Sequence, residues 1–398
     1  SLAVTEKRGL FKSWTILLAI GAFALSLFGT FLTRSPILVS VHAFAADPGR
    51  GLFILALLAF IVGGALLLFA IRARRMEAEG GFELVSRESF LLANNVLLVA
   101  ATFAVFFGTL YPVFVDWATG EKISVGPPYF DTVFLIPMLP LALLVGLGMH
   151  SAWKRTHFNR LAASLRWPAI VAVVLGLTVP FVFFGSASVL TMVAALIGFW
   201  VCFAALIDPL RRAVAERRWP RLVASQWGMI TAHFGLGLFI IGATFTSAYN
   251  LESEYAVSPG DTWDVGDYEL TFVGTRNVTG PNFEAIEGEF TLRKDGDFVA
   301  TMRPQERVYR VQREPMTEAA IDGRVQRDVF IALGTLIGRS PETWSVRVRI
   351  KPLIRLIWYG ALVMALGGIL AVCDRRYRQP VRGESRAKAV AGRPIGEH

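Results

Sequence analysis

One apolar stretch, from Gln226 to Thr246, is long enough to cross a lipid bilayer as a single helix. It contains one ionisable side chain, His233, roughly a third of the way along. An imidazole at that depth must find a partner or stay neutral at a cost, which makes His233 a candidate functional residue. The alternative is a neutral histidine that is hydrogen-bonded to a neighbouring helix. Gly228 and Gly237 flank it, and such small residues let another helix, or a flat ring, come close.

The composition extends this reading to the whole chain. Of the 398 residues, 54% are hydrophobic, and the mean hydropathy is +0.50, which is typical of a polytopic membrane protein. The net charge is +9, but the basic residues lie beside apolar runs, so they indicate topology and not a nucleic-acid surface. The two cysteines form no C-x-x-C or zinc pattern, which argues against thiol chemistry.

The apolar runs predict about eight membrane spans. We expect Asp208 and Pro209 to end the sixth span, and the proline- and glycine-rich residues 125–130 to form a loop. The predicted spans are residues 14–32, 51–71, 90–114, 133–149, 167–184, 189–206, 226–246 and 353–373.

Arginine-rich segments occur at alternate loops, which by the positive-inside rule places both termini in the cytoplasm. The expected organisation is a transmembrane domain of seven spans over residues 1–246 with the His42 loop in the periplasm. A periplasmic β-domain over 247–351, a final span over 352–374 and a basic cytoplasmic tail over 375–398 follow it. This is a multi-pass protein of the bacterial inner membrane, with the lipid bilayer as a partner.

The polar segment 247–351 is predicted to form a small antiparallel β-domain. Residues 290–293 and 298–302 flank a Lys-Asp-Gly-Asp turn, which predicts a hairpin. From Trp344 to Lys351 apolar and polar residues alternate strictly, as in a strand with one buried face.

Among the histidines, His42 follows a semi-apolar stretch that is too short to span, so we expect it at the outer membrane–water interface. A lone loop histidine is usually solvated, and His150 and His157 beside the fourth span are best read that way. Intramembrane acids are nearly absent, which argues against an ion-coupled transporter. The residues alone therefore give two candidate ligands for a metal or cofactor, His42 and His233.

Several strings resemble, in order, those of the CcmF family, the large haem lyase subunit of the cytochrome c maturation system. They are SLAVTEKRG at 1–9, TRS at 33–35 with VSVHAF at 39–44, SRES at 86–89 with Asn94 and Asn95, VGPPYF at 125–130, WGM at 227–229 with Ala232 and His233, and MTEAAI at 316–321. The resemblance extends to about Tyr377 and implies the C-terminal portion of such a protein, with an upstream half elsewhere.

The resemblance also implies roles. His233 matches an intramembrane ligand of a resident haem b, whose other axial ligand lies outside this chain. His42 matches a periplasmic, catalytic ligand of the haem that a periplasmic haem chaperone delivers. That haem is attached covalently to the C-x-x-C-H motif of apocytochrome c, which a thiol-reducing subunit presents. Arg34 is either a partner of a haem propionate or a plain interface arginine.

Three interpretations stay open at this point. The chain is a component of the haem lyase, a non-catalytic haem-binding and docking module of the same assembly, or the paralogue of the lyase that is dedicated to nitrite reductase. Whether the chain is itself an enzyme is open, because no recognisable nucleophile or acid–base set accompanies the histidines.

Overall fold

A computed structural model describes the protein at residues 1–34, 48–73, 81–311, 313–339 and 342–374. The chain divides into two compact units, Ser1–Arg166 and Trp167–His398. Eight helices of the described residues, α2 to α9, are long and apolar enough to cross a membrane, and they confirm the expected polytopic helical fold.

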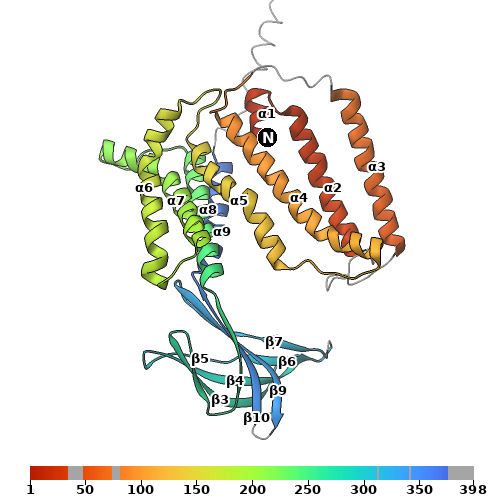
Figure 1. Ribbon diagram of the computed structural model, residues 1–398, viewed down its shortest axis with the longest axis vertical. Helices are drawn as coiled ribbons and strands as arrows, with labels where there is room; N and C mark the ends of the chain where they lie inside the picture. Colours follow the sequence, from red (N-terminus) through yellow and green to blue (C-terminus); the bar gives the residue numbers. More distant parts are fainter. Residues whose placement is uncertain (35–47, 74–80, 312, 340–341, 375–398) are drawn as a thin grey trace, which may run out of the picture. The chain divides into compact units, whose positions relative to one another are not determined.

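The first unit is helical (Figure 1). Here α2 packs against α3, and α4 packs against α5. Large apolar side chains such as Phe60 (80% exposed) and Leu67 (63%) point outward from α3, which suits contact with lipid tails. Its elements are α1 (Leu2–Arg8), α2 (Lys12–Arg34), α3 (Pro48–Arg72), α4 (Arg87–Thr119) and α5 (Pro127–Met149), and α6 (Phe158–Phe184) begins in it.

One local expectation for this unit is corrected. The segment 125–130 is not all loop, because α5 begins at Pro127. Proline has no N–H to lose at the first helical position, so it starts a helix well. Tyr129 then packs on α4: its ring fills the space above Gly108, and its hydroxyl donates to the Ala104 carbonyl at 3.1 Å.

A buried carboxylate ties the helix ends of this unit together. Glu88, at the start of α4, is fully buried and accepts hydrogen bonds from Arg8 Nε (2.9 Å) and from the backbone N–H of Lys154 (2.9 Å). Ser86 caps the same helix by accepting from the Ser89 N–H. Three segments far apart in sequence therefore meet at one charge.

In the second unit α8 (Ala224–Tyr249) packs against α7 (Val189–Glu216) on one side and α9 (Arg355–Val372) on another. The expectation that the helix of the sixth span ends at Asp208 and Pro209 is wrong, because the helix α7 itself continues through Pro209 to Glu216. A proline inside a membrane helix bends it without ending it where neighbouring groups satisfy the freed backbone.

The described residues between 251 and 352 form ten strands in two antiparallel sheets, which agrees with the predicted β-domain. One sheet has the order β1-β10-β9-β8, and the other has β2-β3-β4-β6-β7 with β5 paired to β4. The strands are β1 (Leu251–Val257), β2 (Thr262–Val265), β3 (Tyr268–Thr279), β4 (Phe283–Lys294), β5 (Asp297–Met302), β6 (Gln305–Tyr309), β7 (Pro315–Glu318), β8 (Ala320–Gly323), β9 (Arg327–Arg339) and β10 (Glu342–Pro352).

The predicted hairpin and the predicted alternating strand are both confirmed. Lys294 pairs with Asp297 across a turn in which Asp295 and Gly296 have φ of 53° and 83°, the two positive values that a tight hairpin favours. In β10 the side chains of Trp344, Val346 and Val348 are buried between the sheets.

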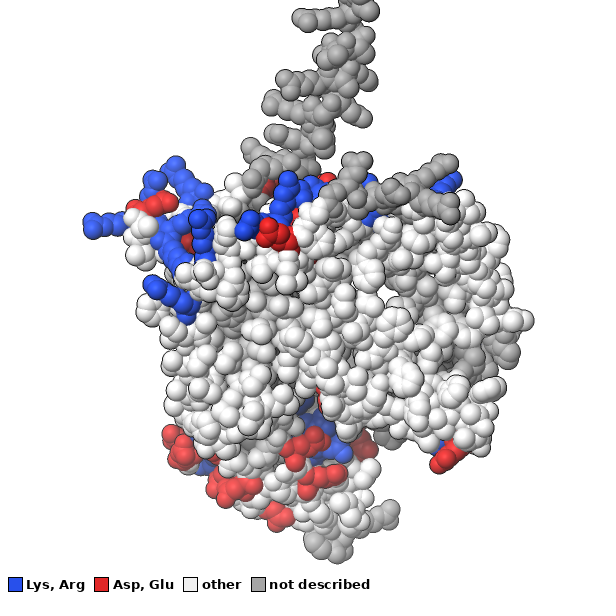
Figure 2. Space-filling view, turned by 45° about the horizontal axis from the view of Figure 1, so that its top comes forward, with Lys and Arg blue, Asp and Glu red and all other residues white. Residues whose placement is uncertain are grey.

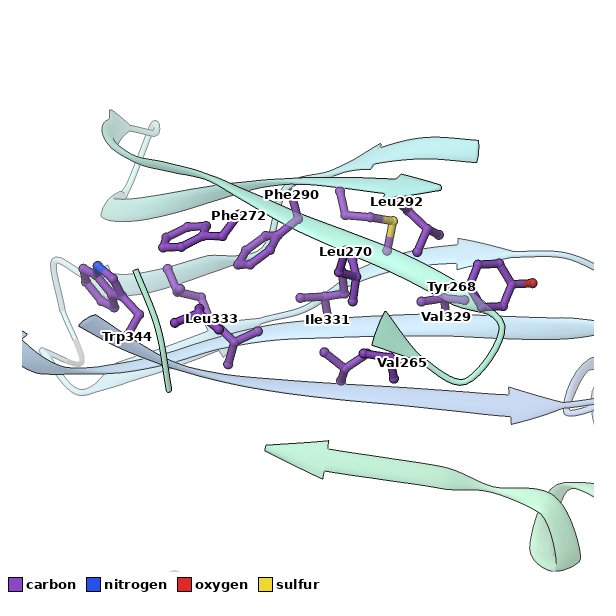
Figure 3. Close-up of a cluster of buried hydrophobic side chains, with 14 residues drawn as sticks. Val265, Tyr268, Leu270, Phe272, Phe290, Leu292, Val329, Ile331, Leu333 and Trp344 are labelled. Atoms are coloured by element: carbon purple, nitrogen blue, oxygen red, sulfur yellow. The ribbon is translucent and has the colours of Figure 1, made fainter. Parts of the chain in front are cut away.

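The core of the β-domain lies between the two sheets (Figure 3). Phe272 and Phe290 stack at 4.7 Å between ring centroids, and both are fully buried. Ile331 and Leu333 from β9 close the core from the other sheet. The domain thus has a hydrophobic core of its own.

The β-domain joins the membrane helices without a linker. Asn250 alone separates α8 from β1, and two residues separate β10 from α9. Thr246 Oγ1 donates to the Pro352 carbonyl at 2.7 Å, and Arg355 Nε donates to Asp328 Oδ1 at 2.8 Å. Helix and sheet are therefore cross-tied where the chain passes between them.

Candidate functional site

Helix α8 carries the intramembrane candidate His233, and its glycines explain how it is held. Gly228, Gly235 and Gly242 recur every seventh residue and face α9. A β-carbon at Gly235 would lie 2.7 Å from the Gly360 carbonyl oxygen, and one at Gly228 would lie 2.6 Å from the Gly367 carbonyl oxygen. The two backbones therefore touch, as small residues allow in membrane helices.

A second side of α8 packs just as closely on α7. A β-carbon at Gly237 would lie 2.4 Å from Cys202 Sγ, and one at Gly198 would lie 2.7 Å from Ile241 Cγ1. Gly228 and Gly237 were expected to admit either another helix or a flat ring, and the structure places a helix against each of them. Both glycines are covered by helices, and neither is open to a ring.

His233 lies on a different part of the α8 surface. At about 100° per residue it is about 160° around the helix from Gly235 and about 40° from Gly237, at the edge of the α7-facing side. Its ring is partly exposed, and Met229, one turn earlier, is 37% exposed. Any ligand of His233 would therefore approach from the Met229 side of α8.

The hydrogen bond of His233 fixes which ring nitrogen carries the proton. Nδ1 lies 2.8 Å from the Met229 carbonyl oxygen, and a carbonyl only accepts, so Nδ1 donates. In the neutral imidazole the lone pair is then on Nε2. Histidine ligands of metals are commonly oriented in this way, with the second nitrogen donating to a carbonyl.

The other candidates that the structure describes lie on other elements. His42 lies outside the described residues, and so does His398. His150 caps the end of α5, and His157 precedes α6. Arg34 is the exposed last residue of α2. No group of three or more His, Cys, Asp or Glu side chains that could hold a metal occurs within the described ranges.

Asn95 on α4 is a buried polar group that was assigned no role from the sequence. It is 8% exposed, and its side-chain nitrogen has no hydrogen-bond partner in the part of the chain that the structure describes. An unpaired amide nitrogen in an apolar surrounding costs stability. The signal available from the sequence was the Asn94–Asn95 pair inside an apolar run.

Comparison with known proteins shows what the chain is similar to. A family model described as the CcmF C-terminal beta-sandwich matches residues 248–352. The cytochrome c-type biogenesis protein CcmF of Pseudomonas aeruginosa is 44% identical over 398 residues, covering 98% of this chain and 60% of that protein. CcmF of Escherichia coli K12 is 42% identical over 387 residues, covering 97% and 59%.

A solved structure of a cytochrome c haem lyase CcmF is similar in fold, with a TM-score of 0.73 at 24% identity, covering 93% of this chain and 56% of that one. Both the sequence and the fold comparisons thus cover nearly the whole chain but little more than half of the matched proteins. The chain is thus similar to the CcmF cytochrome c-type biogenesis proteins over nearly its whole length, and it spans about 60% of theirs.

Proposed function

We propose that this chain is the haem-holding part of a cytochrome c haem lyase, with His233 as one axial ligand of an intramembrane haem b. The observation that carries the proposal is the Nδ1–H bond from His233 to the Met229 carbonyl, which leaves Nε2 as the basic nitrogen in the ring. The haem would supply one-electron chemistry. The chain's own residues hold the imidazole in one tautomer and, through the glycine contacts with α7 and α9, fix the helix that carries it.

The second axial ligand would come from outside this chain, since the relatives are longer by about two-fifths of their length. The orientation proposed from the arginine-rich loops puts both termini in the cytoplasm and the β-domain in the periplasm of the inner membrane. In that orientation His42 faces the compartment where a haem chaperone would deliver its haem.

The spectrum of the reduced protein tests the role of His233. We expect a b-type haem when the chain is co-expressed with the upstream part of a CcmF relative, and its loss in His233→Ala. Added imidazole should restore the spectrum, because it can replace the missing ligand in the space left by the ring. His157→Ala is the matched control, and it should keep the haem. An unchanged spectrum in His233→Ala would show that another residue binds the iron.

We further propose that His42 binds the delivered haem during thioether formation with the C-x-x-C-H cysteines of apocytochrome c, which a thiol-reducing subunit presents. His42→Ala should abolish the holocytochrome c yield while the intramembrane haem spectrum persists. A normal yield would remove His42 from the reaction.

A second candidate function is a haem-binding and docking module in which chemistry follows from proximity. The separate core of the β-domain favours it, because such a unit can present a rigid surface to a partner. Replacement of residues 250–352 by a short linker distinguishes the docking function from the lyase function. Loss of partner co-purification with an intact haem spectrum supports docking, and retained holocytochrome c formation excludes an essential docking role. The paralogue dedicated to nitrite reductase is distinguished by a separate assay, in which the apocytochrome that is supplied carries the atypical haem motif of nitrite reductase.

A further inference from the structure

The last two turns of α7 differ from the rest of that helix. Its first twenty residues, 189–208, rise about 30 Å, which matches the hydrocarbon thickness of a bilayer. Pro209 follows and bends the helix. In Figure 1 the light-green end of α7 projects sideways at the upper left, across the direction of α8 and α9. The segment 209–216 therefore lies beyond a bilayer-length span and projects to the side of α8 and α9.

This segment has one apolar side. Leu210 and Val214 are four residues apart on the same side of the helix and are 43% and 79% exposed. Arg212 and Glu216 lie on the opposite side and are exposed to solvent. Trp219, just after the helix, is 68% exposed. A short helix with an exposed apolar side and a neighbouring tryptophan is the pattern of a segment that lies in a membrane interface.

Positive charge surrounds the apolar side chains. Figure 2 shows it as the blue group at the upper left. Arg217 ends α7 with φ 53°, a left-handed conformation that glycine adopts more easily, so the arginine is kept at a conformational cost. The basic residues of the segment are Arg211, Arg212, Arg217, Arg218 and Arg221, and Glu216 is the one acidic residue from 209 to 223.

We propose that residues 209–221 form an interfacial segment that binds the anionic headgroups of phospholipids. The apolar side of Leu210 and Val214 would enter the acyl boundary, and the arginines would contact phosphate groups at the level of Trp219. Charge complementarity selects the lipid, because clustered arginines at a membrane surface attract anionic lipids and not zwitterionic ones. This proposal does not depend on the haem function.

Fluorescence quenching of the full chain in lipid nanodiscs tests it. The quenchers are brominated phosphatidylglycerol and, at the same mole fraction, brominated phosphatidylcholine. Comparison with Trp219→Phe isolates the contribution of Trp219 from the other tryptophans. We expect Trp219 to be quenched several-fold more strongly by the anionic lipid.

Two variants separate the contribution of the arginines to lipid binding from that of the apolar side chains. Arg212→Gln with Arg217→Gln and Arg218→Gln should abolish the several-fold preference for the anionic lipid, because each arginine near the surface contributes to it. Lys122→Gln with Arg310→Gln and Arg313→Gln removes the same charge at exposed positions elsewhere and should keep the preference. Val214→Ser should weaken quenching by both lipids equally. Circular dichroism confirms that each variant is folded.

Three results would overturn the proposal. Equal quenching by the two lipids in the unaltered chain would show no selection of charge. Absence of quenching by either lipid would show that protein, and not lipid, covers the segment. An equal loss of preference in the Lys122, Arg310 and Arg313 control would show that net charge, and not this segment, attracts the lipid.

Discussion

At the scale of single residues, Gly235 is a position where the contact between α8 and α9 tolerates little change. Gly235→Val places methyl groups against the Gly360 carbonyl and should destabilise the helix pair by about 1–3 kcal/mol. Unfolding of the full chain in a detergent titration measures this. Gly63→Val on α3 is the matched control, because a β-carbon there meets nothing within 4 Å. Equal losses in both variants would refute close packing as the cause.

Substitution of Asn95, unlike that of Gly235, is not expected to lower the stability. Asn95→Leu removes an unpaired buried donor and should leave stability unchanged or raise it by roughly 1 kcal/mol. Asn94→Leu, at a half-buried neighbouring position, serves as the comparison in the same unfolding assay. A marked loss of stability in Asn95→Leu alone would mean that the amide has a partner, such as an ordered water, whose bonds matter.

Glu287 on β4 makes the β-domain sensitive to acid. Burial by itself raises its pKa, but hydrogen bonds from Gln305 and Arg276 outweigh this and hold the pKa below the ordinary carboxylate value. A lowered folded-state pKa gives stability that is complete above the unfolded-state value and is lost as the pH falls through the folded value. Thermal unfolding of the β-domain between pH 7 and pH 3 should show this loss, and Glu287→Gln should flatten the curve below pH 4.5. Glu284→Gln, on the same strand, should retain the dependence on pH.

At the scale of elements, the carboxylate of Glu88 holds α1, α4 and residues 150–157 together. Glu88→Ala leaves Arg8 and the Lys154 N–H without their acceptor and should destabilise these contacts by roughly 1–3 kcal/mol. Hydrogen exchange should become faster in residues 2–8 and 152–156. Glu6→Ala, which removes an exposed carboxylate, should not change these rates. Unaltered exchange in Glu88→Ala would show that packing alone holds the helix ends.

Among the helices and strands, those that depend on a local sequence pattern could be predicted from the sequence. The spans follow from hydropathy, the β4–β5 hairpin follows from the turn at Asp295 and Gly296, and the buried side of β10 follows from strict alternation. Pro127 and Pro209 were misjudged because proline begins one helix and bends another, and only the surroundings decide which.

The candidate site was predictable only in part. His233 is evident as a single ionisable group in an apolar run, but its bond to Met229 and the glycine contacts with α7 and α9 depend on packing. Gly235 and Gly360 are far apart in sequence and meet only in the fold. Glu88 likewise finds Arg8 and Lys154 across long separations that no local pattern encodes.

At the scale of the whole molecule, the β-domain should fold without the helices. Its core is internal, and its first and last strands are paired neighbours, with Leu251 opposite Ile350. Residues 250–352 expressed alone should give a dispersed amide spectrum and cooperative unfolding. Phe290→Ala should lower the stability by about 3–5 kcal/mol, and Phe298→Ala, at a 63% exposed position, by less than about 0.5 kcal/mol. A collapsed spectrum would show that α8 and α9 complete the fold.

The position of that domain between α8 and α9 has a consequence for how the protein is made. The glycine side of α8 leaves the ribosome before its partner α9, and roughly 100 residues of β-domain must be synthesised between them. At bacterial elongation rates this takes on the order of 5–20 s. During that interval Gly228, Gly235 and Gly242 have no helix to contact, so the tightest helix pair of the second unit is also the last to assemble.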